Sequence, residues 1–301
     1  MQFRLLGPLD VLDHGTVVDL GGPKQRALLA RLLVTPNRAV AVDQLVDDLW
    51  GEDVPASAPK MVQIYISHLR KVLPACVIVT RPPGYLAEVE EHAIDSVRFD
   101  RLRRAGRAAL DAGDADEAGA LLREALGLWR GEALAEFDEP FARVERAHLG
   151  ELRLVCLEDR FDADLARGAH GELAAELAAE IARHPLRERL RRQAMLALYR
   201  SARHADALAV FDDYRRTLDV ELGLEPSQEL RTLQHQILTQ DPALTGDAPG
   251  GETPEALEGW AHRARFVGEG EASLQARARA FRGYRARGDA RSAARAAAWL
   301  A

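Results

Sequence analysis

The chain has 301 residues, of which 47% are hydrophobic and 29% are charged, and its formal net charge is −7. This length and composition predict a globular protein with room for two domains and a sizeable core. They do not suit a membrane protein, because no apolar run approaches the roughly 20 residues that cross a bilayer. The N-terminus also lacks the basic-then-apolar pattern of a secretory signal, so we expect a cytoplasmic protein.

The charge is unevenly distributed along the chain. Residues 1–93 carry a net charge of −2, residues 94–254 carry −9 and residues 255–301 carry +4. Residues 54–87 contain no acidic side chain, and their four cations are Lys60, Arg70, Lys71 and Arg81. Because the local field decides where phosphates dock, an overall acidic chain can still offer a nucleic-acid surface in this segment.

The first fifty residues show alternating strand formers followed by helical periodicity. The pattern predicts strands at 3–12 and 17–20, and helices at 24–34 and 42–50. Pro23 suits the start of the first helix. Asp43 can cap the second helix, and Gly51 ends it.

The next segment predicts a third helix, over 60–73, and then a hairpin of strands 77–80 and 85–89. One face of the helix is apolar and consists of Val62, Tyr65, Ile66, Leu69 and Leu73. The opposite face carries Lys60, Gln63, Ile64, Ser67, His68 and Lys71. A basic, acid-free face with hydrogen-bonding side chains suits a DNA major groove. The plainer interpretation is a solvated helix beside a hairpin.

Five motifs carry a resemblance to a known family: FRLLGPLDVL, GGPKQRALLARLL, VAVDQLVDDLWG, MVQIYISHLRKVL and VTRPPGYL. Together they resemble the winged-helix DNA-binding domain of response regulators, and more closely the actinobacterial antibiotic regulatory proteins (the SARP family). The resemblance extends to about residue 240. It implies that the third helix enters the major groove, the second crosses the backbone and the hairpin reaches the minor groove.

The resemblance also implies roles for individual residues. Base-edge contacts would fall on Gln63, Ile64, Ser67 and His68, although the family pattern often has Arg at the last two positions. Contacts to phosphates or the minor groove would fall on Lys60, Arg70, Lys71, Thr80 and Arg81, with Lys24 and Arg26 as weaker candidates. Each has a structural alternative, since Ile64 could belong to the core and His68 could simply be solvated.

Residues 94–240 show helical periodicity and no convincing strand. The pattern predicts helices at 98–110, 115–129, 140–167, 172–183, 186–200, 205–218 and 226–238. Gly168-Ala-His170 and Ala202-Arg-His204 lie 34 residues apart, which is the tetratricopeptide period. The resemblance implies a bacterial transcriptional activation domain with roles in self-association and activation. The alternative is a helical bundle that serves as a spacer.

The predicted fold class is therefore mainly α with a small β component. A winged helix-turn-helix over 1–93 precedes an all-α, tetratricopeptide-like domain over 94–240. Residues 241–254 read as a Pro/Gly/Thr linker, and residues 255–301 as a short Arg/Ala-rich helical tail with a turn at Gly288-Asp289.

Nothing in the sequence indicates catalysis, a cofactor or a metal site. There is no phosphate-binding G-x-x-x-x-G-K-[ST] loop, and the nine histidines are scattered without a helical H-x-x-x-H pair. Cys76 and Cys156 are far apart and fit no metal-ligand spacing, so we expect two buried thiols. We expect a protein that is not an enzyme.

Two functions from different classes remain open. The first is a sequence-specific transcriptional activator, expected from the family to regulate a secondary-metabolite gene cluster. It would bind double-stranded DNA as a head-to-tail homodimer on direct repeats and recruit RNA polymerase holoenzyme. The second is a tetratricopeptide-type adaptor whose winged helix does not bind DNA. The acidic middle domain and the absence of Arg at positions 67 and 68 favour the adaptor.

Overall fold

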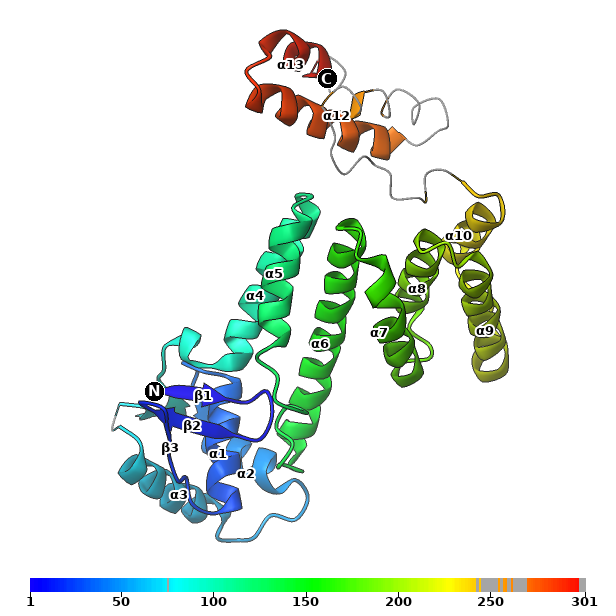
Figure 1. Cartoon of the computed structure of the whole chain (residues 1–301). Helices are drawn as coiled ribbons and strands as arrows, with labels where there is room; N and C mark the ends of the chain where they lie inside the picture. The colour runs from blue at the N-terminus through cyan, green and yellow to red at the C-terminus, as the bar shows by residue number, and fades with distance from the viewer. Residues whose placement is uncertain are drawn as a thin grey trace. The chain divides into compact units, whose positions relative to one another are not determined.

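The computed structural model of the chain describes residues 1–74, 76–241, 244, 254, 257–258, 261 and 270–297 (Figure 1). It divides into two compact units, Met1–Ala163 and Asp164–Ala301. Most described residues are helical, and strands occur in the N-terminal part, which confirms the predicted fold class. The unit boundary falls inside a long helix, so the domain boundary expected at 93/94 stays a prediction.

Three short strands open the chain and form an antiparallel sheet in the order β1-β2-β3. They are β1 (Gln2–Arg4), β2 (Asp10–Asp13) and β3 (Thr16–Val17). The single strand predicted over 3–12 is wrong. The backbone N–H groups of Leu5 and Leu6 donate to the Asp95 carboxylate instead of to a neighbouring strand, and the segment between β1 and β2 turns into the core.

Three helices follow: α1 (Pro23–Val34), α2 (Val42–Trp50) and α3 (Ala58–Val72). Their apolar faces pack into one core with the sheet residues, as the helical periodicity predicts. The N-cap of α2 is Ala41 and not Asp43, because strand β4 (Val40–Ala41) runs directly into the helix in extended conformation. Asp43 lies in the first turn instead.

The predicted hairpin forms from β5 (Ile78–Arg81) and β6 (Gly84–Ala87), and β4 joins it in the sheet order β4-β6-β5. Gly84 permits this close pairing, because a Cβ at that position would lie 1.8 Å from the Val40 carbonyl oxygen. Helix α3 followed by this hairpin gives the winged helix its wing.

A short 3-10 helix, η1 (Glu91–Ala93), leads to α4 (Asp95–Asp111), α5 (Ala115–Leu126) and α6 (Pro140–Ala166). Helices α4 and α5 form a hairpin whose turn contains Gly113. The segment between α5 and α6 is not helical. Its residues Leu134 and Phe137 are buried in the core of the winged helix, at 0% and 2% exposure. We call residues 130–146 the strap, because they cross from the helical part back onto the winged helix.

The second unit contains α7 (His170–Arg183), α8 (Glu188–Arg200), α9 (His204–Leu222) and α10 (Gln228–Leu238). Sequential helices in this series pack against one another, which is the arrangement that the 34-residue period predicts. Helices α12 (Gly270–Ala286) and α13 (Ala290–Ala297) form the predicted tail hairpin around Gly288. Most of the linker predicted over 241–254 lies outside the described residues.

The two cysteines differ in environment. Cys156 is buried, and burial raises the pKa of its thiol to about 12. Cys76 is exposed in the loop before β5, so the expectation of two buried thiols is wrong for Cys76. Across the part of the chain that the structure describes, no helix is long and apolar enough to cross a membrane.

Candidate nucleic-acid interface

Helix α3 separates its side chains into a buried and an open face. Val62, Ile66 and Leu69 are at most 2% exposed, and Tyr65 stacks on Trp50 of α2 with ring centroids 6.5 Å apart. The predicted outer residues are all exposed: Lys60, Gln63, Ile64, Ser67, His68 and Lys71. Ile64 is 43% exposed, so the alternative in which it belongs to the core is wrong.

Among the residues that the structure describes, no carboxylate pairs with the cations of this open face. Within the described ranges, Lys60 and Lys71 of α3 and Arg81 of the wing form no ion pair. Their charge is therefore available to an external anion such as a phosphate. The open face also offers an amide, a hydroxyl, an imidazole and an aliphatic side chain, which are the groups that read base edges.

Arg70 and Thr80 connect α3 to the wing. Arg70 Nε donates to the Ile78 carbonyl oxygen at 2.9 Å, and an Arg70 terminal nitrogen donates to Thr80 Oγ1 at 2.8 Å. The guanidinium also lies over the Tyr85 ring, 5.9 Å from its centroid. Arg70 is half-buried, so it fixes the wing against the helix, and Thr80 lies at the edge of the exposed face.

His68 is joined to the start of α1. Its Nδ1 lies 2.7 Å from Gln25 Nε2, and Gln25 Oε1 accepts a hydrogen bond from the Gly22 N–H at 2.8 Å. The sequence contains a signal for the second contact, because Gln25 stands three residues after the N-cap, as in a capping box. No local pattern indicates the contact with His68, which lies 43 positions away in the chain.

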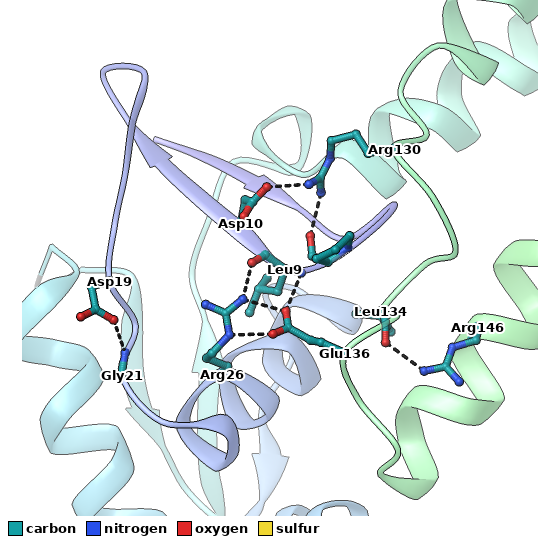
Figure 2. Close-up of polar contacts among 10 residues, drawn as sticks. Leu9, Asp10, Asp19, Gly21, Arg26, Arg130, Leu134, Glu136 and Arg146 are labelled. Atoms are coloured by element: carbon teal, nitrogen blue, oxygen red, sulfur yellow. Dashed lines mark hydrogen bonds and ion pairs between the residues drawn. The ribbon is translucent and has the colours of Figure 1, made fainter.

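Lys24 and Arg26, the two weaker phosphate candidates, are bound to the strap, and Figure 2 shows the contacts of Arg26. Arg26 makes two hydrogen bonds to the Glu136 carboxylate, at 2.7 and 2.8 Å, and one to the Leu9 carbonyl oxygen at 2.6 Å. The hydrogen bond to Glu136 raises the pKa of the Arg26 guanidinium. Lys24 Nζ lies 3.0 Å from Glu139 Oε1 and donates to the Leu49 carbonyl oxygen.

Other charged groups complete this junction between the strap, α4 and the winged helix. Arg130 pairs with Asp10 at 2.5 Å, and Arg146 donates to the carbonyl oxygens of the strap itself (Figure 2). Asp95 is buried at the start of α4 and accepts from both Leu5 and Leu6. Burial raises the pKa of Asp95, although the two N–H donors lower it.

The second unit holds a groove of about 560 Å³ between α7, α8 and α9. The groove is open because its walls carry small side chains such as Ala174, Ala178 and Ala209, and Arg191 also lines it. The Arg191 side chain is 5% exposed and pairs with Asp213 at 2.6 Å. This surface can receive side chains of another protein, since it combines apolar walls with charged groups.

Nothing in the described residues forms a metal centre: they contain no group of three or more His, Cys, Asp or Glu side chains placed to hold an ion. The arrangement on α3 and the wing offers hydrogen-bond donors, acceptors and cations, which are the groups that contact the backbone and base edges of a nucleic acid.

Comparison with known proteins gives two family matches. Residues 15–87 match the family described as "Transcriptional regulatory protein, C terminal". Residues 94–238 match the family described as "Bacterial transcriptional activator domain".

Individual relatives carry related names. The chain is 44% identical to the regulatory protein AfsR of Streptomyces coelicolor over 89% of its own length, but spans 28% of AfsR. It is 40% identical to the regulatory protein DnrI of Streptomyces peucetius, covering 85% of this chain and 98% of DnrI. The solved structure of Mycobacterium tuberculosis EmbR in complex with a low-affinity phosphopeptide is similar with a TM-score of 0.78. That match has 36% identity and covers 83% of this chain and 69% of the EmbR chain.

Proposed function

Because the chain belongs to the SARP family of transcriptional regulators, we propose that it binds duplex DNA sequence-specifically through α3 and the wing and activates transcription. In this proposal Gln63, Ile64, Ser67 and His68 contact base edges. Lys60, Lys71 and Arg81 contact phosphates or the minor groove, and Arg70 and Thr80 hold the wing in place for that contact. The protein acts in the cytoplasm on a secondary-metabolite gene cluster, and it is not an enzyme.

One observation carries the proposal: the buried and exposed faces of α3 are the two faces that the sequence pattern predicts. All six side chains expected to face the DNA are exposed, and the cations among them have no carboxylate partner in the described residues. An ordinary surface helix mixes both signs of charge and would not leave such a face acid-free. The proposal gives Lys24 and Arg26 no direct part, because Glu139 and Glu136 already bind them.

The proposal includes a head-to-tail pair on direct repeats. Copies in tandem face the same side of the duplex when their half-sites are ~10–10.5 base pairs apart, or a multiple of that. The helical part would then supply contacts to the second copy and to RNA polymerase holoenzyme. The groove lined by Ala178, Arg191 and Asp213 supports a protein contact of this kind. It is also the feature that favours the adaptor as a second candidate.

Selection of bound sequences from a random duplex pool, at fixed salt, tests the proposal. We expect a site made of two direct repeats, with affinity that falls steeply as salt rises. A selected site with inverted symmetry would contradict the head-to-tail pair. If micromolar protein binds no duplex, or binds it with an affinity that does not depend on salt, DNA recognition is contradicted. The protein-interaction adaptor then remains as the candidate function.

The base contacts are tested separately with Gln63→Ala. Because a glutamine side chain can read adenine through two hydrogen bonds, its loss should cost ~1–3 kcal/mol at one base position. The remaining positions of the selected site should keep their preference. Equal losses on the selected site and on random DNA would show that Gln63 does not read a base.

A further inference from the structure

A short chain of hydrogen bonds links the turn before α1 to the middle of α3. Asp19 Oδ1 accepts from the Gly21 N–H at 2.9 Å and fixes the turn (Figure 2). Gly21 has φ +83°, a conformation that favours glycine. A Cβ on Gly21 would lie 2.0 Å from Gln25 Oε1. The turn therefore leaves the space that the Gln25 amide fills.

Both ends of the Gln25 amide are engaged, and this determines its orientation. The Gly22 N–H is a donor, so the atom 2.8 Å from it must be the amide oxygen. The NH₂ group then points to His68 Nδ1, at 2.7 Å. An amide NH₂ only donates, so Nδ1 must accept, and the proton of the neutral imidazole lies on Nε2.

We propose that Gln25 is a positioning residue for base recognition: it holds His68 as the Nε2–H tautomer, so that the exposed ring presents a donor to the DNA. In the major groove a donor pairs with an acceptor, such as N7 of a purine, O6 of guanine or O4 of thymine. This tautomer offers no free acceptor, so it cannot bind the amino groups of cytosine and adenine, which are donors. This inference rests on the proposed function, because it assigns the specificity of the same face.

The alternative is that Gln25 only caps α1, in which case its loss weakens the fold without changing which base is read. Nitrogen-15 NMR of the histidine rings in the full chain separates the two. Spectra are recorded at about pH 8.5, two units above the ordinary pKa of a histidine side chain. His68→Ala identifies the His68 signals among those of the nine histidines. We expect the Nε2–H tautomer in the wild type and a mixture of tautomers in Gln25→Met.

Two variants keep this test decisive. Methionine preserves the unbranched length and helix preference of glutamine but offers no donor. Gln25→Glu keeps an acceptor for the Gly22 N–H and replaces the donor by a second acceptor, so His68 should gain a proton on Nδ1. A wild-type ring with its proton on Nδ1, or a ring that is unchanged in both variants, would overturn the inference.

The DNA measurement uses a double-mutant cycle. Wild type, Gln25→Met, His68→Ala and the double variant are each put through the random-pool selection at the same salt. Gln25→Met should relax the preference at the base position that His68→Ala also relaxes, on the order of fivefold for one hydrogen bond. In the His68→Ala background it should have no further effect.

Each outcome of this cycle has a separate meaning. Equal losses at every base position, or additive effects in the double variant, would show that Gln25 has only a structural role. If the wild type binds no duplex, the proposed function fails and the role in specificity fails with it. The tautomer result does not depend on DNA, so it still decides whether Gln25 sets the protonation of the ring.

Discussion

Two groups of cations on the winged helix resemble each other in sequence and differ in structure. Lys60 and Lys71 of α3 are exposed, and no carboxylate in the described residues pairs with them. Lys24 and Arg26 of α1 lie against the strap, where Glu139 and Glu136 bind them. A cation is available to phosphate only where the fold brings no acid over it, because a bound carboxylate must otherwise be displaced.

The difference shows how the protein uses the same residue types for two purposes. The strap residues that neutralise α1 are more than 100 positions away in sequence, and they arrive with the apolar side chains Leu134 and Phe137. Electrostatic pairing and core packing therefore act together at this closed junction. On the open face of α3, no carboxylate among the described residues pairs with Lys60 or Lys71, and these cations can bind a ligand.

The largest expected effect tests whether the strap belongs to the winged-helix core. Phe137→Ala removes a side chain that is 2% exposed and leaves a cavity. We expect a loss of about 3–5 kcal/mol in the free energy of unfolding, measured by urea denaturation of the full chain. The winged helix should also unfold at a lower urea concentration, even though Phe137 lies outside residues 1–93.

A matched control lies within the strap itself, near the start of α6. Val144 of α6 is 73% exposed, so Val144→Ala should change the free energy of unfolding by no more than about 0.5 kcal/mol. If Phe137→Ala lowers the free energy of unfolding no more than this control does, Phe137 does not contribute to the winged-helix core. The strap and the open face of α3 would then not differ in the way argued above.

Arg26→Ala tests the polar half of the junction. The substitution removes two hydrogen bonds to Glu136 and one to the Leu9 carbonyl oxygen. Hydrogen bonds to charged groups contribute ~1.5–3 kcal/mol, and the lower end applies here because the Arg26 side chain is 25% exposed. Thermal unfolding should show the loss. Affinity of the remaining folded protein for duplex DNA, and its salt slope, should be unchanged.

The outcome for Arg26 also measures what the sequence can and cannot predict. Periodicity predicts the two faces of α3, since a 3.6-residue repeat needs only the residues of the helix itself. The resemblance gives Arg26 as a weaker phosphate candidate, and no sequence pattern links it to Glu136, which lies 110 positions away. Sequence reasoning also misses Asp95, whose hydrogen bonds end β1 and split the predicted first strand.

The wing is an intermediate case. Strand formers on both sides of Arg81-Pro82-Pro83-Gly84 predict the hairpin, and the structure confirms it. The position of the hairpin against α3 depends on Arg70, whose bonds to Ile78 and Thr80 cross from helix to sheet. Sequence patterns predict elements well and contacts between elements poorly, because a contact depends on the geometry of both partners.

Lys71→Ala is the counterpart of Arg26→Ala on the open face. Its side chain has no partner in the described part of the chain, so the free energy of unfolding should change by at most about 0.5 kcal/mol. Loss of one phosphate contact should weaken binding to all sequences alike and reduce the salt slope by about 1. Titrations at several salt concentrations measure this. A stability loss with an unchanged slope would place Lys71 in the same class as Arg26.

The pH dependence of the unfolding free energy gives a further test of the junction around Asp95. Burial raises the pKa of Asp95 in the folded chain, so the folded state holds its proton more tightly than the unfolded state. Stability from this difference is complete below the unfolded value of 3.8 and is lost as pH rises through the folded value. Asp95→Asn cannot titrate. The unfolding free energy of the wild type minus that of the variant should therefore fall as pH rises above about 4, by at most ~1.4 kcal/mol per pH unit. Urea denaturation at a series of pH values measures the difference. If it rises with pH instead, the N–H donors of Leu5 and Leu6 outweigh burial, and the junction stabilises the charged carboxylate.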